Sequence, residues 1–390
     1  MSKLEQLISE LCPNGVEYRK LEKCCNILDR QRKPVTKSAR ETGEYPYYGA
    51  NGIQDYVSDY IFDGTFVLVG EDGSVITKNG NPVVTWAQGK IWVNNHAHII
   101  GEIDGVLLRY LYHFIQTVDV TSLIHGNIPK LTGGDFKAIP IALPPLPVQE
   151  EIVRILDNFT ELTAELTAEL TARKKQYDYY RDELLTFKDG EAEWKTLGDL
   201  CKIGDGLHGT PKYDDNGEYY FINGNNLDNG KITFKTKTNK VDNTIFYKHG
   251  NDFSVEKTIF MSINGTIGSV SFYNNEKIVL GKSVAYFNIE SSELYSRYLY
   301  YFLKTDYSSN YFEAQKTGST IKNLGLKALR GFKIPIPPLK EQERIVAILD
   351  KFDILVNDIS SGLPAEIAMR NKQYEYYREL LLGFDKADRS

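Results

Sequence analysis

The chain has 390 residues, a formal net charge of −6 at pH 7 and 42% hydrophobic residues. This length allows two or three domains that each bury a core, and the composition is that of an ordinary globular protein. The acidic balance argues against a simple electrostatic nucleic-acid binder, which is usually strongly basic, so any DNA contact must come from local basic patches or be shared with a partner.

The first domain-sized region covers about residues 16–143. Short runs with strand-type composition occur at 65–70 (TFVLVG) and 90–100 (KIWVNNHAHII), with glycine-containing turn signals between them. A helical pattern follows at 106–116 (VLLRYLYHFIQ). The region is expected to be a compact α+β domain with a mostly β core.

The clearest helix in the sequence runs from Val148 to Phe187. Its apolar residues recur at steps that alternate between three and four, which is the seam of a coiled coil. About forty residues at ~1.5 Å each give a rod of roughly 60 Å. The rod contains a tetrapeptide repeat, LTAELTAEL at 162–170. Each added or removed TAEL unit would change the length of the rod by about 6 Å.

A second domain-sized region, at about 193–336, repeats the layout of the first. Strand-type runs lie at 258–263 (TIFMSI) and 277–289 (KIVLGKSVAYFNI), and a helical pattern lies at 293–304 (ELYSRYLYYFLK). This region is also expected to fold as an α+β domain with a mostly β core.

A second helical block runs from about Lys340 to Phe384 and has the same apolar seam. The sequence SGLP at 361–364 interrupts this block. Because glycine ends helices well and proline starts them well, a break or sharp kink is expected near Gly362.

The two helical blocks carry one signature twice. PPLPVQEEIVRILDNF at 144–159 corresponds to PPLKEQERIVAILDKF at 337–352, and eight of the last eleven positions match. Farther along, RKKQYDYYR from Arg173 and RNKQYEYYR from Arg370 match at seven of nine positions. A repeat of about half the chain length indicates two copies of one architectural unit. Each block shows one apolar stripe, and its simplest partner is the other block, packed antiparallel.

This combination resembles the DNA-sequence-specificity subunit of type I restriction-modification enzymes. The resemblance rests on the proline-rich lead into Q-E-x-I-V-x-I-L-D-x-F, on the later K-Q-Y-x-Y-Y-R and on the duplication. The TAEL units resemble the central spacer of the type IC branch. The resemblance implies two α+β target recognition domains with mostly β cores, related by pseudo-two-fold symmetry and separated by two long antiparallel coiled-coil helices. The expected segments are recognition domain 1 (1–145), a central helical spacer (146–190), recognition domain 2 (191–338) and a C-terminal helical spacer (339–390).

The resemblance further implies a non-catalytic subunit whose domains each read one half of a bipartite site in double-stranded DNA. In that family the helices dock two modification (methyltransferase) subunits, and motor-nuclease subunits can join. The rod would then be a ruler, because a change of ~6 Å is close to two base pairs at about 3.4 Å each. We therefore expect TAEL copy number to set the unread gap of the target.

Candidate DNA-reading residues recur in Gly- and Asn-rich loops at matching places in both halves. Direct readout uses Arg or Lys on guanine, Asn or Gln on adenine, and donors to phosphates. The candidates are Arg32, Lys33, Tyr48, Asn51, Asn94, His96, His125, Asn127 and Lys130 in the first domain, and His208, Thr210, Lys212, Asn223, Asn225, Lys282, Thr317, Ser319 and Lys322 in the second. For any one of them, an ordinary hairpin turn or a solvated side chain is the competing interpretation.

The sequence contains no convincing catalytic or cofactor motif. His96-x-His98 is a pair without a third metal ligand, and NPVV at 81–84 lacks the second proline and the aromatic residue of an amino-methyltransferase loop. We expect no catalytic residue, no metal and no cofactor. The competing interpretations are an enzyme in its own right, and a coiled-coil adaptor with protein- or glycan-binding ends.

The cysteines and the apolar runs bear on location. Cys12, Cys24, Cys25 and Cys201 form neither a disulfide framework nor a zinc motif, which fits a reducing cytoplasm. The N-terminal stretch lacks an apolar export signal, and no apolar run is long enough to span a membrane. A cytoplasmic protein without membrane contact is expected.

Overall fold

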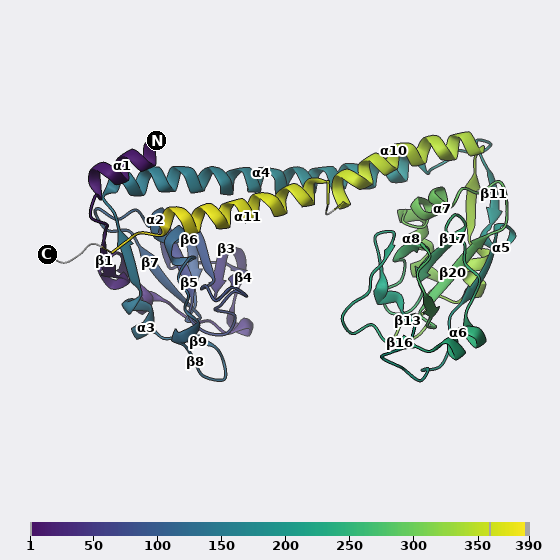
Figure 1. Cartoon of the computed structure of the whole chain (residues 1–390), viewed down its shortest axis with the longest axis horizontal. Helices are drawn as coiled ribbons and strands as arrows, with labels where there is room; N and C mark the ends of the chain where they lie inside the picture. The colour runs from purple at the N-terminus through teal and green to yellow at the C-terminus, as the bar shows by residue number, and fades with distance from the viewer. Residues whose placement is uncertain (1, 359, 387–390) are drawn as a thin grey trace. The chain divides into compact units, whose positions relative to one another are not determined.

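The computed structural model describes residues 2–358 and 360–386, which form two compact units (Figure 1). Unit 1 comprises Met1–Leu166 and Ile367–Ser390, and unit 2 comprises Thr167–Glu366. Each unit therefore combines one domain that contains β-sheet with segments from both helical blocks. The α+β class predicted from the sequence is confirmed.

A six-stranded sheet, in the order β2-β7-β5-β6-β3-β4, forms the centre of unit 1. Neighbouring strands are antiparallel except β3 and β6, which are parallel. The strands are β2 (Asn26–Ile27), β3 (Thr42–Gly49), β4 (Gly52–Val57), β5 (Phe62–Gly70), β6 (Val84–Val93) and β7 (Ala97–Gly101). Successive residues of β5 point to opposite faces, so Val67 and Val69 join one buried cluster and Leu68 joins another.

Unit 1 also contains shorter helices and strands. They are α1 (Lys3–Leu11), β1 (Glu17–Lys20), α2 (Leu108–Ile115), β8 (Ile124–His125), β9 (Lys130–Leu131), α3 (Gly133–Ala138) and β10 (Pro140–Leu143). Helix α2 contacts β5 and β6, and its buried side chains share a cluster with Val148, Ile152 and Leu156 of the rod. The core of the first domain therefore continues into the rod.

Unit 2 contains a four-stranded sheet, β12-β20-β17-β18, a three-stranded sheet, β16-β13-β19, and the two-stranded pairs β11-β21 and β14-β15. The strands of the unit are β11 (Glu193–Thr196), β12 (Cys201–Asp205), β13 (Tyr219–Ile222), β14 (Leu227–Asp228), β15 (Lys231–Ile232), β16 (Lys240–Val241), β17 (Thr258–Ser262), β18 (Val270–Phe272), β19 (Ile278–Leu280), β20 (Val284–Ile289) and β21 (Lys333–Ile336). Its domain helices are α5 (Leu197–Leu200), α6 (Asn243–His249), α7 (Ser296–Phe302), α8 (Asp306–Gln315) and α9 (Leu326–Gly331).

The two longest strand-type runs of the sequence each form two strands. The run at 90–100 is divided between β6 and β7, and the run at 277–289 is divided between β19 and β20. The first strand of each run ends with a bond of its parallel ladder, since the amide of Asn94 donates to Tyr48 O (3.0 Å) and the amide of Gly281 donates to Ile222 O (2.8 Å). The chain turns after these bonds, and the second strand of each run pairs with another strand, β7 with β5 and β20 with β17.

The rods are α4 (Leu146–Leu184), α10 (Leu339–Asn357) and α11 (Leu363–Leu382). The predicted break near Gly362 is confirmed, since α10 and α11 are separate helices. A Cβ atom at Gly362 would stand 2.3 Å from Ile354 O and 2.8 Å from Leu355 O. Only glycine therefore allows this close approach of the backbone.

Within each unit, the rod segments run antiparallel, as predicted (Figure 1). In unit 1, Phe159 of α4 stacks on Tyr377 of α11 with ring centroids 5.3 Å apart. The chain beyond α11 returns to the start of α4, because Val16 N donates to Asp385 O (3.0 Å) beside β1, which pairs with β10. In unit 2, the end of α4 leads to β11, which pairs with β21 before α10.

The repeated glutamine of the two signatures joins each rod to its own domain. Gln149 is fully buried, its Nε2 donates to Pro144 O (2.8 Å) and Gly105 O (3.2 Å), and its Oε1 accepts from Leu107 N (2.9 Å). Gln342 is equally buried and makes the same three bonds with Pro337, Glu293 and Tyr295. The repeated glutamine is therefore a hydrogen-bonded joint between each rod and its domain.

The repeated aspartate holds a helix of the domain. Asp157 lies 2.7 Å from Arg109 Nε and 2.8 Å from Nε2 of the buried His113, whose Nδ1 lies 2.9 Å from the hydroxyl of Tyr374 on α11. In unit 2, Asp350 binds Arg297 and Tyr301 in the same way. The titratable imidazole of His113 in unit 1 thus occupies the position that the phenol of Tyr301 has in unit 2.

This difference predicts a pH dependence of unit 1. Burial, together with Arg109 and Arg378, lowers the pKa of His113 in spite of its hydrogen bond to Asp157. The unfolded chain therefore takes up this proton near pH 6.5 while the folded chain resists it, so the free energy of unfolding falls as the pH drops below about 6.5. We expect His113→Tyr to remove this loss between pH 7.5 and 5.5, as measured by hydrogen exchange of α2 peptides corrected for the intrinsic rate.

The chain supplies its own matched variant. Tyr301→His should introduce the corresponding acid sensitivity into α7 of unit 2. An α2 whose protection responds to pH identically before and after His113→Tyr would contradict this assignment.

Candidate nucleic-acid interface

Three loops of unit 1 lie against one another: the β3–β4 turn, the segment after β5 and the β8–β9 hairpin. Backbone hydrogen bonds join the second loop to the third, from Gly73 N to Pro129 O (2.9 Å) and from Leu131 N to Glu71 O (2.8 Å). A cavity of about 560 Å³ is bordered by all three loops. Among its lining residues are Asn51, Gln54, Asp72, His96, Ile128 and Lys130.

The same bonds recur in unit 2, although the loop sequences differ. The amide of Gly265 donates to Lys322 O (3.0 Å), and the amide of Leu324 donates to Ile263 O (2.9 Å). The hairpin of unit 1 reads HGNIPKL, whereas that of unit 2 reads KTGSTIKNL. The arrangement is therefore a property of the duplicated architecture.

Two further segments are anchored beside these loops in each unit. Lys33 N donates to Val93 O (3.3 Å), and Leu207 N donates to Leu280 O (2.7 Å), which places the arms 33–40 and 207–214 next to the turns that follow β6 and β19. We call the three loops, the arm and the turn of each unit together its loop cluster. The loop clusters comprise residues 33–40, 49–52, 70–75, 94–96 and 124–131 in unit 1, and residues 207–214, 223–226, 262–269, 281–283 and 316–324 in unit 2.

All eighteen predicted DNA-reading residues lie in or directly beside the loop clusters. Fourteen of them have exposed side chains: Lys33, Asn51, His96, His125, Asn127, Lys130, His208, Thr210, Lys212, Asn225, Lys282, Thr317, Ser319 and Lys322. The other four, Arg32, Tyr48, Asn94 and Asn223, are buried or partly buried. Exposure thus separates side chains that can reach a ligand from those that shape the loops.

The less exposed candidates have internal partners. Arg32 donates from Nη1 to Glu71 Oε2 and to Ala97 O, both at 2.6 Å. Asn94 accepts from the amide of His96 (2.8 Å) and donates to Gln54 Oε1 (3.2 Å). Their contribution is to hold loops and neighbouring side chains in place.

Gln54 is a functional candidate that the sequence reasoning missed. Its side chain is exposed, borders the cavity of unit 1 and is oriented by the buried Asn94. Glutamine is one of the two side chains that can bond both edge groups of adenine in the major groove. The only sequence signal was its position two residues beyond Gly52, after the Asn51-Gly52 turn.

Asn51 and Asn225 occupy corresponding turns in the two units. Both side chains are exposed, and neither amide has a hydrogen-bond partner among the residues that the structure describes. The adjacent Asn226, by contrast, is buried and donates to Thr233 O (3.0 Å). Each unit therefore presents, at this turn, an asparagine whose donor and acceptor are both available to a ligand.

The chain matches the family model described as type I restriction modification DNA specificity domain twice, at residues 13–173 and 190–369. The two matches cover most of the chain. The chain belongs to this family of specificity subunits. It is accordingly a subunit for sequence-specific DNA recognition and not an enzyme, and the family predicted from the repeated signatures is confirmed.

Two curated specificity subunits are similar over much of their length. A putative type I restriction enzyme specificity subunit from Haemophilus influenzae is 38% identical, and the alignment covers 95% of this chain and 96% of the relative. The EcoR124I/EcoR124II specificity subunit from Escherichia coli is also 38% identical, with 72% of each chain covered.

The fold is also similar to that of solved specificity subunits. The crystal structure of the type I S subunit from M. genitalium gives a TM-score of 0.56 at 15% identity and covers 96% of this chain and 97% of that one. A chain from a study of type I complex assembly and conformational transition gives a TM-score of 0.55 at 16% identity, with coverages of 95% and 98%.

No helix in the described part of the chain is long and apolar enough to cross a membrane.

A charged network lies beneath the loop cluster in unit 1 of the specificity subunit. Asp29, Glu71 and His98 bring potential metal-ligand atoms within 4.8 Å of one another. Arg32 lies 2.6 Å from Glu71, and Lys130 lies 3.2 Å from it, so cations of the chain itself balance the carboxylates. Burial opposes ionisation of Asp29, but His98 and Arg32 hold its pKa below the ordinary value. The network is therefore a structural support for Lys130.

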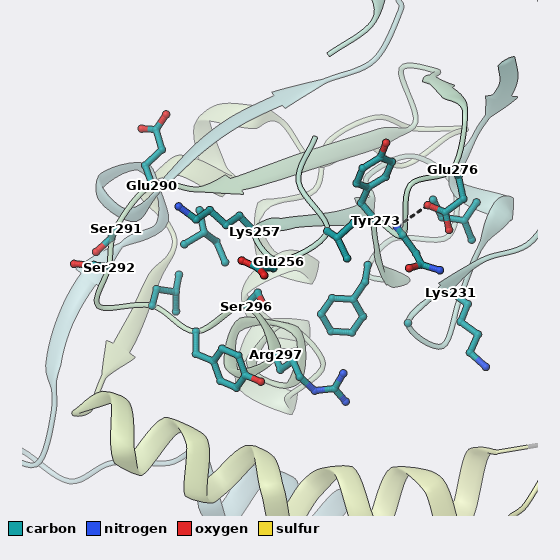
Figure 2. Close-up of a pocket in the computed structure, with 18 residues that line it drawn as sticks. Lys231, Glu256, Lys257, Tyr273, Glu276, Glu290, Ser291, Ser292, Ser296 and Arg297 are labelled. Atoms are coloured by element: carbon teal, nitrogen blue, oxygen red, sulfur yellow. Dashed lines mark hydrogen bonds between the residues drawn. The ribbon is translucent and has the colours of Figure 1, made fainter. Parts of the chain in front are cut away.

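A cavity of about 1000 Å³ in unit 2 lies away from the predicted residues, beside β18 and the start of α7 (Figure 2). Glu256, Glu276 and Glu290 border it together with Lys231, Lys257 and Arg297. Because acidic side chains balance the basic ones, this cavity lacks the positive excess that attracts phosphates. The loop cluster is the better candidate for DNA contact.

Proposed function

We propose that each loop cluster of the specificity subunit reads one half of a bipartite site in double-stranded DNA. Residues 1–145 and 191–338 are the two recognition domains in this proposal. The observation that carries it is the duplication of the loop clusters, with the same backbone bonds but different side chains in the two units. Equal scaffolds with unequal contact residues are what two different half-sites require.

We propose that the rods set the gap between the half-sites and dock two modification (methyltransferase) subunits. Tyr179 and Tyr376 occupy the same position in the two copies of K-Q-Y-x-Y-Y-R and are 63% and 62% exposed. Large exposed aromatic side chains are typical anchors at protein interfaces, and two equivalent anchors favour two equivalent partners. Optional motor-nuclease subunits complete the proposed assembly.

The proposed location is the cytoplasm. The four cysteines are buried and free in the structure, as is usual in a reducing compartment.

Substitution of Asn51 and Asn225 by alanine tests which loop cluster reads which half-site. We expect Asn51→Ala to relax or abolish recognition in one half of the target only, and Asn225→Ala to do so in the other half only. The loss of a base contact of this kind costs about 1–3 kcal/mol, or roughly 5–150-fold in discrimination. The measurement is genome-wide mapping of methylated sites in cells that carry the variant and its modification subunits.

The matched control is Asn229→Ala, because Asn229 is exposed but lies outside the loop cluster. The Asn229→Ala variant should leave the methylated sequence unchanged. Because Asn229 has a φ of 39°, which alanine adopts less readily, the substitution affects only stability. If Asn51→Ala and Asn225→Ala altered the same half-site, or neither half-site, the proposed division of labour would be wrong.

A further inference from the structure

Ile128 and Ile321 lie at corresponding positions of the two hairpins, and both are left in solvent. Their exposed fractions are 69% and 66%. Among the large apolar residues that the structure describes, Tyr247 alone is more exposed. Burial of an isoleucine side chain is worth about 1.5–3 kcal/mol, so each hairpin leaves this stabilisation unused within the chain.

Both hairpins hold the isoleucine on an ordered turn. In unit 2, Thr317 and Asn323 exchange backbone hydrogen bonds of 2.8 and 2.9 Å across the base of the tip. Gly318 has φ 93°, and a Cβ atom there would stand 2.3 Å from Ile321 O. The left-handed conformation and the close contact both require glycine. The side chain is thus presented before any ligand binds, which lowers the entropic cost of a contact.

The hairpin of unit 1 also holds its isoleucine on a glycine turn, with other residues around it. Its hairpin is closed by the pairing of His125 with Lys130 in β8 and β9. Gly126 has φ 85°, and a Cβ atom there would stand 3.2 Å from Ile128 O. Two different sequences therefore produce one result, an outward isoleucine on a glycine turn.

The surroundings of the isoleucines are polar, and the two hairpin tips themselves are basic. Ile128 borders the cavity together with Asn51, Gln54, His96 and Asp72, and Asp72 pairs with His96 and Lys130. A lysine follows each isoleucine within two positions. Neither hairpin tip, 125–130 or 317–322, contains an acidic residue. A protein partner would favour a contiguous apolar patch, whereas the major groove of DNA offers hydrogen-bonding base edges, phosphates and the isolated methyl group of thymine. The observations favour DNA.

We propose that Ile128 and Ile321 are base-contacting residues, one for each half-site, that pack against a thymine methyl group in the major groove. The inference rests on the proposed function and adds to it an apolar component of specificity. Asparagine and glutamine would read edges by hydrogen bonds, while the isoleucine distinguishes thymine from cytosine, which lacks the methyl group.

The test uses the complex with modification subunits and a duplex that carries the methylated site found by mapping. Ile128→Ala and Ile321→Ala should each weaken specific binding about 5–20-fold, as expected for one lost apolar contact, and leave non-specific binding unchanged. Ile→Leu variants should bind within about twofold of the unaltered protein. Uracil in place of one thymine should weaken the unaltered complex and should no longer weaken the matching alanine variant, because the two changes remove the same contact.

Leu11→Ala and Val255→Ala are matched controls, since these residues are 43% and 42% exposed but lie outside the loop clusters. Equal losses on specific and non-specific duplexes, unaltered binding by the alanine variants, or the absence of coupling to uracil at every thymine would overturn the inference. So would failure of the alanine variants to assemble with the modification subunits, because a protein surface would then cover the tips. If the unaltered complex showed no sequence preference, the proposed function itself would fail.

Discussion

Deletion of Thr167–Leu170 is expected to replace the methylated target by one whose two half-sites are unchanged and whose gap is shorter. One TAEL unit contributes about 6 Å of helix, which is close to two base pairs, and its removal rotates the following helix by about 40°. Leu162, Leu166 and Leu170 are all half-buried at four-residue spacing, so the deletion preserves the apolar pattern. Mapping of methylated sites should show loss of the original sites and appearance of the new ones.

The reciprocal insertion of a second copy of Thr167–Leu170 should lengthen the gap. Thr167→Ala is the control, because it alters the exposed surface of the same segment without altering the length of the helix. Retention of the original gap after the deletion would show that the rod is not the ruler, while the proposal for the loop clusters would stand.

Gln342→Leu is expected to destabilise unit 2 by about 2–4 kcal/mol. The substitution has nearly the same volume but removes three hydrogen bonds and leaves the amide of Tyr295 and the carbonyls of Glu293 and Pro337 without their partner. An unpaired buried polar group costs about 1–3 kcal/mol. Urea unfolding of the whole subunit, followed by hydrogen exchange of α7 and α10 peptides, measures the loss and locates it.

Glu343→Leu is the matched control, since Glu343 is the next residue of α10 and is exposed. It should change the free energy of unfolding by no more than about 0.5 kcal/mol. Gln149→Leu should produce the larger effect in unit 1. If Gln342→Leu and Glu343→Leu were equivalent, the glutamine would not be a joint.

The sequence predicted the elements whose chemistry is local. The seams of α4, α10 and α11 and the break at Gly362 follow from apolar spacing and from glycine and proline, which act within a few residues. The splitting of the runs at 90–100 and 277–289 was not predictable in this way. The first strand of each run ends where its parallel pairing ends, at Tyr48 of β3 and Ile222 of β13, and these residues lie far away in the sequence.

The candidate site was predictable as a region but not residue by residue. Arg32 and Gln54 show why: the sequence marked the arginine, whose guanidinium is bound to Glu71, and passed over the glutamine, whose side chain is exposed. Accessibility depends on which groups fold back onto the chain. Ile128 and Ile321 were not predicted as DNA-reading residues, because an apolar residue next to a turn is normally assigned to the core.

The composition of unit 1 has a consequence for synthesis on the ribosome. Its core includes Leu382, and the hydroxyl of Tyr18 donates to Phe384 O (2.8 Å), so residues translated first are completed by residues translated last. Unit 2 is one continuous stretch of chain and can finish folding while the C-terminus is still unmade. A nascent subunit therefore carries an unfinished N-terminal domain until termination, and premature stop codons near residue 370 would damage the domain at the opposite end of the sequence.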